Sequence, residues 1–382
     1  MLTEAVFKHS THLEDCFYDG PEKVQEAIAT LDDIIKQFSG SNENIKIQSK
    51  VDGAPSIIFI KLGKDFGIST KAIFNKTPKC AWSLDDIQDI FGEKSQDLVN
   101  KLKVAYTYLK NITPNNSVYQ GDLLYTKDTL EKMTIEGKEC ITWHPNTILY
   151  SVELDTELGQ KIANSELGIA VHTRYTWDGK ELTSLELSDF DVHSDEFKKS
   201  PKVFLIDTYQ TDFSAIVNLD DDEKESYIQN KKYVENSLKN INFDLLKKYE
   251  DILDGYHNYI IKQDIQDDYI GNLKIYIEDK KLTKKYPNII EDIDKYSKDL
   301  NEFYQVYLAL RSMKNIIIHH LNELQNSNCF VQKRTRDGIV LVPTDPEGFV
   351  LTSGPMSGYK LVDRYTFSKL NFSNNILKGF KH

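Results

Sequence analysis

The hydrophobic residues near the start of the chain recur at the period of an amphipathic helix. Pro21 stands where such a helix would begin, and Gly40 stands just beyond its end. Residues 20–39 are therefore expected to form a helix that buries one face. The apolar positions on that face are Val24, Ala27, Ile28, Leu31, Ile34 and Ile35.

The pattern then changes to the period of a β-strand. Residues 45–60 and 67–74 alternate or run apolar, and the Gly-Lys-Asp sequence at 63–65 separates them. This arrangement predicts a strand, a tight turn and a second strand. A helix is expected over 84–109, and a short one before residue 168. Further strands are expected at 117–126, 146–155, 168–177, 184–192 and 202–209.

The pattern of hydrophobic and polar residues changes again at about residue 216. Residues 216–325 are rich in charge, and Tyr, Ile and Leu recur there at helical spacing. The expected breaks within this stretch are Gly255, Gly271 and Pro287. Strand patterns return at 338–343, 348–353 and 358–367. We therefore expect one α+β domain, formed by residues 1–215 and 326–382, with a helical insertion at 216–325.

Composition narrows the class of protein. The chain has 382 residues and a net charge of −12, which weighs against a passive nucleic-acid binder. An enzyme that acts on nucleic acid can still gather lysines in one groove. No apolar run approaches the roughly 20 residues needed to cross a bilayer, so no membrane partner is expected.

The cysteines bear on the compartment. They match no disulfide framework and no metal-ligand spacing, so reduced thiols are expected. This favours the cytoplasm, or the host cytoplasm if the Asn-, Lys- and Ile-rich composition reflects a viral genome. The four cysteines are Cys16, Cys80, Cys140 and Cys329.

A lysine stands between two apolar runs in the sequence SKVDGAPSII. One interpretation is that Lys50 and Asp52 flank an ordinary turn. The other is that Lys50 is a nucleophile in a pocket, which requires a lowered pKa because the ordinary value is about 10.4. Gly53 would let the chain turn closely past a ligand, and Asp52 would bind a cation or orient the amine.

The sequence Lys50-Val-Asp52-Gly53 resembles motif I of the covalent nucleotidyltransferases, which include DNA ligases, RNA ligases and mRNA capping enzymes. In that superfamily the lysine attacks the α-phosphate of ATP or GTP and forms a lysyl-nucleotide. Tyr119-Gln-Gly-Asp122-Leu resembles motif III, whose carboxylate binds the ribose. Thr147-Ile-Leu-Tyr150 resembles the strand of motif IIIa, where an aromatic ring stacks on the base.

Two further motifs follow in the order of the family. Pro346-Glu347-Gly-Phe-Val resembles motif IV, whose glutamate helps to bind the catalytic metal, although Asp337-Gly-Ile-Val has a similar texture. The sequence from Gly358 to Ser368 resembles motif V of the phage RNA ligases, and its Lys360 would neutralise the α-phosphate. Lys71 lies where the family often has a basic residue near the phosphates; the alternative is a solvated lysine at a strand edge.

Departures from the family pattern concern three positions. Asp122 stands where glutamate is usual, and Val362 stands where motif V has a second lysine. Gln48 stands where DNA ligases tend to have an acid that contacts the base. An amide can still read adenine, so ATP is the expected nucleotide, with GTP as the alternative.

The resemblance implies a complete set of site residues. The catalytic residues would be Lys50, Asp52 and Lys360. Mg²⁺, or Mn²⁺ in its place, would be bound by Glu347 and Asp52, with water completing the coordination. Metal and Lys360 would lower the pKa of Lys50 when ATP binds. The nucleotide would be held by Gln48, Gly53, Lys71, Asp122, Tyr150, Glu347, Lys360 and Arg364.

Histidines provide no complete zinc set. His9 and His12 have helical spacing and His319 and His320 are adjacent, but no carboxylate or cysteine completes a site. His172 lies on a strand of the expected cleft domain. It either faces the substrate or is an ordinary histidine of the core or the sheet edge.

The resemblance implies a ligase adenylation fold, with antiparallel sheets around a nucleotide cleft. The stretch after Lys360 is too short for the OB-fold of DNA ligases and capping enzymes, so a C-terminal OB-fold is not expected. An ATP-dependent polynucleotide ligase is therefore expected, acting on 5′-phosphate and 3′-hydroxyl ends of RNA rather than DNA. The insertion at 216–325 would be a platform for this second substrate, or a structural or dimerising bundle.

Other functions remain open at this point. One alternative is the transfer of AMP or GMP to an acceptor that is not a nucleic acid. A second is a protein that binds nucleotide or nucleic acid on the same fold without catalysis, and a third is a helical interaction protein in which K-x-D-G is a coincidence. Labelling with α-labelled nucleotide separates these alternatives.

Overall fold

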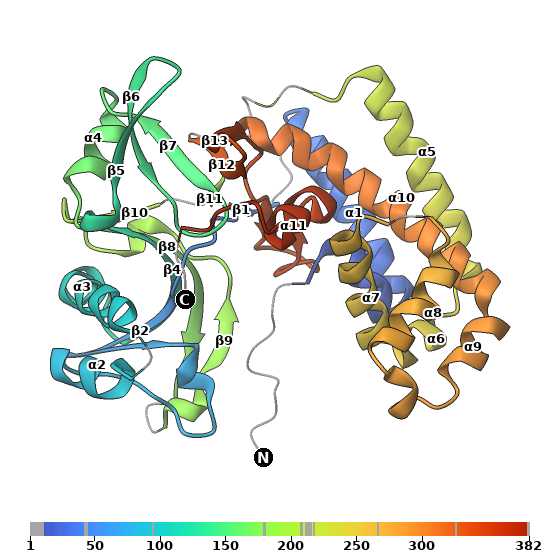
Figure 1. Cartoon of the computed structure of the whole chain (residues 1–382), viewed down its shortest axis with the longest axis horizontal. Helices are drawn as coiled ribbons and strands as arrows, with labels where there is room; N and C mark the ends of the chain where they lie inside the picture. The colour runs from blue at the N-terminus through green and yellow to red at the C-terminus, as the bar shows by residue number, and fades with distance from the viewer. Residues whose placement is uncertain are drawn as a thin grey trace.

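The chain folds into a strand-rich lobe and a helical lobe (Figure 1). This α+β architecture confirms the expected class. None of the helices in the described ranges is long and apolar enough to cross a membrane. The structure, a computed structural model, describes residues 11–41, 45–93, 95–178, 181–206, 209–210, 216, 218–265, 267–324 and 327–379.

A six-stranded sheet forms much of the strand-rich lobe, with strand order β10-β8-β4-β2-β3 and β9 paired with β8. Alternate residues of a strand point to opposite faces, so Ile57 and Phe59 of β2 pack on the helices α2 and α3, whereas Ser56 and Ile58 point to the other face. The bounds are β2 Ser56–Leu62, β3 Asp65–Thr70, β4 Ser117–Thr126, β8 Leu167–Thr176, β9 Glu186–Asp189, β10 Val203–Leu205, α2 Leu84–Phe91 and α3 Gln96–Ile112.

A four-stranded antiparallel sheet lies between the lobes, in the order β11-β1-β14-β15. Ser49 of β1 lies opposite Phe349 of β14, and Val350 lies opposite Lys360 of β15. This register brings the segment around Lys50 beside segments from the far end of the chain. The bounds are β1 Ile47–Ser49, β11 Tyr209–Gln210, β14 Phe349–Leu351 and β15 Lys360–Leu361.

A five-stranded sheet completes the strand-rich lobe, in the order β13-β12-β7-β6-β5. Its β5–β6 hairpin falls where no element is expected from the sequence, because the positions at its outer end are charged and exposed. The short helix α4 is the one expected before residue 168. The bounds are β5 Glu131–Ile135, β6 Lys138–Trp143, β7 Leu149–Glu153, β12 Asn328–Thr335, β13 Gly338–Pro343 and α4 Glu157–Asn164.

The helical lobe contains the stretch expected to be helical and also the N-terminal helix α1. Leu31 of α1, Leu310 of α10 and Phe349 of β14 are fully buried in one shared core. The core of the helical lobe therefore extends into the four-stranded sheet. The bounds are α1 Pro21–Phe38, α5 Asp221–Ser237, α6 Phe243–Lys248, α7 Glu250–Gln263, α8 Tyr269–Asp279, α9 Ile289–Lys295 and α10 Ser297–Leu321.

Most expected elements are confirmed, including the helix at 20–39 and the strand at 117–126. The strand expected at 67–74 ends at Thr70, where a 3₁₀ turn, η3 (Lys71–Phe74), begins. The breaks expected at Gly255 and Gly271 are wrong, since both glycines lie inside helices. At Gly255 an added Cβ would lie 2.5 Å from the Tyr276 hydroxyl, so this glycine lets α7 and α8 approach closely.

The strand expected at 358–367 is wrong beyond Leu361. The chain forms α11 (Arg364–Phe372) instead. The Asp363 side chain accepts hydrogen bonds from the backbone N–H groups of Tyr365 and Thr366, which is a helix N-cap. The cap at Asp363 therefore ends the strand shortly after Lys360.

Candidate active site

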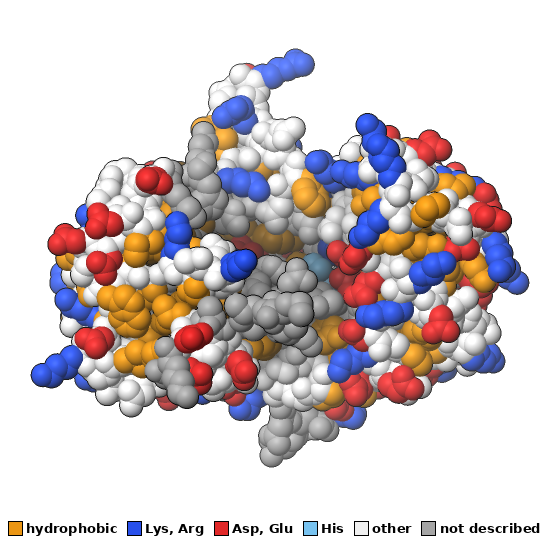
Figure 2. All heavy atoms as spheres, turned by 90° about the horizontal axis from the view of Figure 1, so that it is seen from below, with side chains coloured by type: hydrophobic (Ala, Val, Ile, Leu, Met, Phe, Trp, Pro, Cys, Tyr) orange, Lys and Arg blue, Asp and Glu red, His pale blue; other side chains and the backbone are white. Residues whose placement is uncertain are grey.

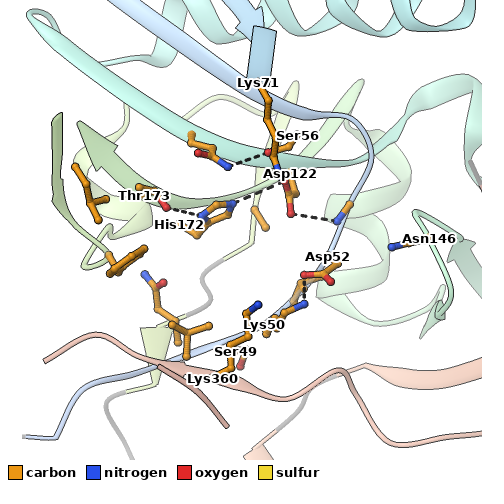
Figure 3. Close-up of a pocket in the computed structure, with 18 of the residues that line it drawn as sticks. Ser49, Lys50, Asp52, Ser56, Lys71, Asp122, Asn146, His172, Thr173 and Lys360 are labelled. Atoms are coloured by element: carbon orange, nitrogen blue, oxygen red, sulfur yellow. Dashed lines mark hydrogen bonds and ion pairs between the residues drawn. The ribbon is translucent and has the colours of Figure 1, made fainter. Parts of the chain in front are cut away.

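A cleft of about 330 Å³ lies between the six-stranded sheet and the four-stranded sheet (Figure 3). Its volume is within the range of small-molecule sites, roughly 300–1,000 Å³. Lys50, Asp52, Asp122 and Lys360 all line it. The cleft therefore gathers residues that are far apart in the sequence.

One wall of the cleft is a face of the six-stranded sheet. Strand pairing places Ser56, Asp122 and Ala170 in one transverse row, and Gln120 and Thr173 beside it. These residues share a face because they alternate along their strands. The Gln120 side chain donates a hydrogen bond to the Ser56 hydroxyl at 3.0 Å. Asp122 is thus held on a central strand and points into the cleft.

Lys50 follows β1 on the opposite wall. Its backbone N–H donates to the Gly348 carbonyl at 2.8 Å, which ties it to the segment before β14. Its ammonium forms ion pairs with Asp52 and with Glu347, the latter at 3.1 Å. The side chain is 15% exposed. Lys50 is therefore a cleft lysine, and the interpretation as an ordinary surface turn is wrong.

Two of the lysines that line the cleft, Lys50 and Lys360, have opposite pKa shifts. Burial by itself lowers the pKa of Lys50, but the carboxylates of Asp52 and Glu347 outweigh it and raise that pKa above its ordinary value. Burial, assisted by the nearby Lys50, lowers the pKa of Lys360 to about 8. Bound cations would therefore have to overcome this raised pKa before the Lys50 amine becomes neutral.

Glu347 lies beneath Lys50 and is 1% exposed. Its Oε2 accepts hydrogen bonds from the Lys50 ammonium and from the backbone N–H of Asp52, at 3.1 and 2.9 Å. Burial, and then the Asp52 charge, raise the pKa of Glu347, while Lys50 opposes them. Asp337 instead lies exposed at the tip of the β12–β13 hairpin. Of the two motif IV candidates, Glu347 is thus the one that contacts Lys50.

The fit to a divalent cation rests on two carboxylates. Glu347 Oε1 is buried and has no hydrogen-bond partner among the described residues, so an oxygen ligand is available there. Asp52 is the second acid: burial raises its pKa, but Lys50 outweighs burial and keeps it low. No group of three or more His, Cys, Asp and Glu side chains in the described ranges is arranged for a metal. Two carboxylates match Mg²⁺, which commonly uses one or two carboxylates with substrate phosphates and water.

Gly53 allows a close approach of two backbones. An added Cβ would lie 2.2 Å from the Leu123 carbonyl oxygen. The backbone N–H of Gly53 lies 3.5 Å from the Asp122 carboxylate, to which it donates. Gly53 therefore allows the segment that contains Lys50 and Asp52 to pack directly against β4. This close packing accounts for a glycine at position 53 without any contact to a ligand.

Gln48 and Lys71 both line the cleft, as expected. The Gln48 amide is buried and donates to the Val192 carbonyl at 3.2 Å, so its orientation is held by the protein. Lys71 is exposed at the start of η3, on the wall opposite Lys50 and Lys360 (Figure 3). The cleft is therefore bordered by cations on both walls.

Tyr150 does not line the cleft, so its expected stacking on a base does not fit its position. It is buried in β7, and its ring stacks on Trp143 at a centroid distance of 5.5 Å. The strand that lies beside Asp122 is β8. The resemblance assigned base stacking to Tyr150 because residues 146–155 have an apolar strand pattern. Such a pattern does not show which strand borders the cleft.

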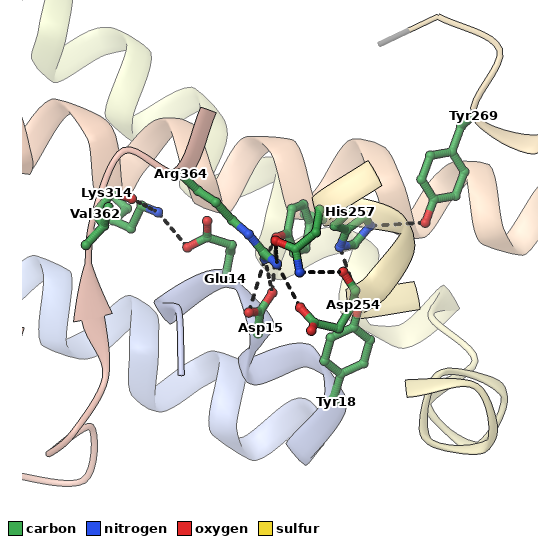
Figure 4. A network of polar contacts seen from close by, with 11 residues as sticks. Glu14, Asp15, Tyr18, Asp254, His257, Tyr269, Lys314, Val362 and Arg364 are labelled. Carbon is green, nitrogen blue, oxygen red and sulfur yellow. Dashed lines mark hydrogen bonds and ion pairs between the residues drawn. The ribbon is translucent and has the colours of Figure 1, made fainter. Parts of the chain in front are cut away.

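Arg364 is also not among the residues that line the cleft, and it belongs to a network of polar contacts instead (Figure 4). Its guanidinium pairs with Asp15 at 2.9 Å and with Asp254 at 2.7 Å. The nearby Lys314 ammonium contacts Glu14 and the Val362 carbonyl, each at 2.6 Å. The expected contact of Arg364 with the cofactor has no support here, because α11 turns this side chain into the helical lobe.

Further residues of the cleft have no motif. Tyr175 and Leu187 lie opposite each other on β8 and β9, and both line the cleft, as does Phe190. His172 lines it as well, 3.8 Å from Asp122 and hydrogen-bonded to the Thr173 hydroxyl. The alternation along 168–177 is the one sequence signal that could have identified residues of β8.

The four cysteines are free thiols. His12 is mostly buried, and burial, then Arg364, lowers its pKa. His9 lies outside the described residues, so its pairing with His12 has no structural counterpart here.

Comparison with known proteins adds a family but no function. A family model described as "Family of unknown function (DUF6267)" matches residues 7–376. No curated protein and no solved structure matches the chain.

Proposed function

The chain belongs to DUF6267, a family of unknown function, and we propose that it is an ATP-dependent nucleotidyltransferase that forms a covalent lysyl-AMP on Lys50. The observation that carries this proposal is the position of the Lys50 ammonium. It lies between Asp52 and Glu347, in a cleft that Lys360 also lines. These four residues come from the three segments that resemble motifs I, IV and V.

The first reaction step would use Lys50 as the nucleophile. Its ammonium must first lose a proton, for which the paired Asp52 carboxylate is the nearest acceptor. The neutral Nζ then attacks the α-phosphorus of ATP, so that a P–N bond forms and the nitrogen releases a second proton to water. The bond from this phosphorus to the bridging oxygen breaks, and pyrophosphate leaves with that oxygen. Covalent catalysis by an activated lysine follows this general scheme.

The remaining cleft residues suggest how ATP would lie. Tyr175, Leu187 and Phe190 would contact the base at the apolar end of the cleft. Asp122 would accept hydrogen bonds from the ribose hydroxyls. Lys360 and Lys71 would hold phosphate oxygens on which negative charge lies, which is the main requirement of phosphoryl transfer.

Glu347 and Asp52 would hold Mg²⁺, or Mn²⁺, through the unpartnered Glu347 Oε1 and the Asp52 carboxylate. When bound, the cation would supply positive charge to the phosphate and offset the negative charge of both carboxylates beside Lys50. Since those carboxylates raise the Lys50 pKa, offsetting their charge favours the neutral amine.

The second and third steps follow the resemblance to phage RNA ligases. AMP would pass from Lys50 to the 5′-phosphate of a nucleic acid, RNA rather than DNA. A 3′-hydroxyl would then displace AMP and join the ends. We place this activity on an adenylation fold in the cytoplasm, where free thiols remain reduced.

The proposal is tested by incubating the full chain with α-labelled ATP and Mg²⁺. We expect an acid-labile label on wild type and none on Lys50→Ala. Lys61→Ala is the control, because Lys61 is not among the residues that line the cleft and its ammonium donates to the Lys110 carbonyl. Absence of a Lys50-dependent label with ATP and with GTP would overturn the proposal.

Labelled protein is then offered 5′-phosphorylated RNA and DNA. Transfer of AMP to the RNA followed by joining supports the ligase. A stable label that no nucleic acid removes would point instead to an acceptor of another chemical class. Label from GTP alone would correct the choice of nucleotide.

A further inference from the structure

A second cavity, of about 630 Å³, lies in the strand-rich lobe. It is bordered by α3, by strands β5, β6 and β12, and by the C-terminal segment at 377–379. It is larger than the cleft at Lys50. The proposed first reaction step uses none of its residues.

Three cationic side chains line this second cavity: Lys101, Arg334 and Lys378. Lys101 forms an ion pair with Asp97, which also lines the cavity. Arg334 is exposed and forms no ion pair within the described part of the chain. Among the described residues, the Lys378 ammonium donates to one backbone carbonyl, that of Asn371. Arg334 and Lys378 are therefore available to contact a ligand. Besides Asp97, the cavity has one lining acid, Glu131.

Trp143 supplies a buried donor at the same cavity. The side chain is 3% exposed, and its indole Nε1–H lacks a partner among the described residues. Buried donors without a partner are rare and call for an acceptor. Together with the cations, this donor indicates a ligand that carries negative oxygen atoms.

A short loop after β6 separates the second cavity from the cleft. His144 lines the cavity, whereas Asn146 lines the cleft. The backbone N–H of Gly379 donates to the Asn146 carbonyl at 2.8 Å. An added Cβ at Gly379 would lie 1.5 Å from the His144 carbonyl oxygen, so this segment packs directly on the loop. A ligand in the cavity would therefore lie close to the nucleotide cleft.

The helical lobe offers a weaker surface for a polyanion. On the face seen in Figure 2, its lysines and arginines are interspersed with acidic side chains. A surface of mixed sign provides little net attraction for phosphates. The second cavity is the better candidate because its two available cations are opposed by one acid.

We propose that the second cavity binds the phosphodiester backbone of a single-stranded nucleic acid. Arg334 and Lys378 would contact phosphate oxygens, and arginine suits this role because it donates two parallel hydrogen bonds. The identity of this strand as the second substrate rests on the proposed function; its binding does not.

The test measures binding of a fluorescent single-stranded RNA to the full chain by anisotropy, without ATP. We expect Arg334→Gln and Lys378→Gln each to weaken binding about tenfold. Each should also reduce the slope of log K against log salt by about 1. Lys333→Gln is the matched control, because Lys333 is exposed on the same strand and points to the opposite face.

Three outcomes would overturn this inference. One is wild-type binding by both variants, and another is an equal loss in Lys333→Gln. The third is binding of inorganic phosphate or ATP at Arg334 and Lys378 without binding of RNA. That result would identify the ligand of the cavity as a small anion. Normal labelling of Lys50 with any of these results would leave the proposed function standing. Arg334-dependent RNA binding without Lys50 labelling would support this inference alone.

Discussion

Lys50 and Lys360 line one cleft, and their surroundings shift their pKa values in opposite directions. Lys50 contacts two carboxylates, whereas Lys360 is half-buried and lies near the Lys50 ammonium. The sequence singled out both lysines as candidate site residues, but it did not predict this difference. It depends on distances between residues that are about 300 positions apart, such as Lys50 and Glu347.

The pKa difference predicts the order of acetylation in the protein without nucleotide. Acetic anhydride modifies neutral amines, so Lys360 should reach half of its maximal reactivity at about pH 8. Lys50 should do so only at higher pH, because Asp52 and Glu347 stabilise its ammonium. Mass spectrometry across a pH series measures both midpoints.

The exposed Lys76 controls for access of the reagent in that experiment. Asp52→Asn should move the Lys50 midpoint to lower pH and spare Lys76. A Lys50 midpoint below that of Lys360 would contradict the electrostatic account.

Gly53 predicts a loss of stability on a minimal substitution. Gly53→Ala should lower the free energy of unfolding by about 1–3 kcal/mol, because its Cβ would meet the Leu123 carbonyl at 2.2 Å. Chemical denaturation measures the change. Gly63→Asn is the control, since Gly63 lies in the β2–β3 turn at φ 58°, a conformation that asparagine tolerates. Equal stability of Gly53→Ala and wild type would show that the two backbones do not touch.

At the scale of elements, the segment from β15 to α11 connects the cleft with the helical lobe. Lys360 faces the cleft, the Val362 carbonyl accepts from Lys314 of α10, and Arg364 enters the ion-pair network with Asp15. The sequence predicted a strand here because apolar residues alternate. The Asp363 cap and the buried partners of Arg364 favour a helix instead, and alternation alone cannot reveal them.

The buried pair of Lys314 and Glu14 predicts that removing one partner destabilises the protein more than removing both. Both side chains are fully buried, so Lys314→Met alone should cost about 3–5 kcal/mol by leaving a carboxylate without its partner. Adding Glu14→Leu should recover part of that loss. Thermal and chemical unfolding of the single and double variants measure the difference.

The exposed pair of Glu157 and Lys161 is the matched control for this cycle. Lys161→Met should leave the unfolding midpoint unchanged, because exposed pairs contribute little. A Lys314→Met variant as stable as wild type would show that the pair does not hold β15 to the helical lobe.

At the scale of the whole molecule, the stretch 216–325 is part of a larger core. Leu31 of α1 and Phe349 of β14 are buried in the same cluster as Leu310 of α10. The term insertion therefore describes its place in the sequence, but its apolar face also covers α1 and the four-stranded sheet.

This shared core predicts the result of a deletion. A chain in which a short linker replaces 216–325 should lose cooperative thermal unfolding, because α1 and β14 would expose their apolar side chains to water. Differential scanning calorimetry and circular dichroism measure the transition. A cooperative transition near that of wild type would show that the strand-rich lobe folds independently.

The sequence by itself determined most helices and strands, because the hydrophobic period of 3.6 or 2 is a local property. It also identified Lys50, Asp52, Asp122 and Lys360, because short motifs are local as well. Tertiary structure alone decided that these residues line one cleft, that Tyr150 and Arg364 do not, and that Glu347 rather than Asp337 reaches Lys50. Those outcomes depend on strand register and on burial between distant segments, which no local pattern specifies.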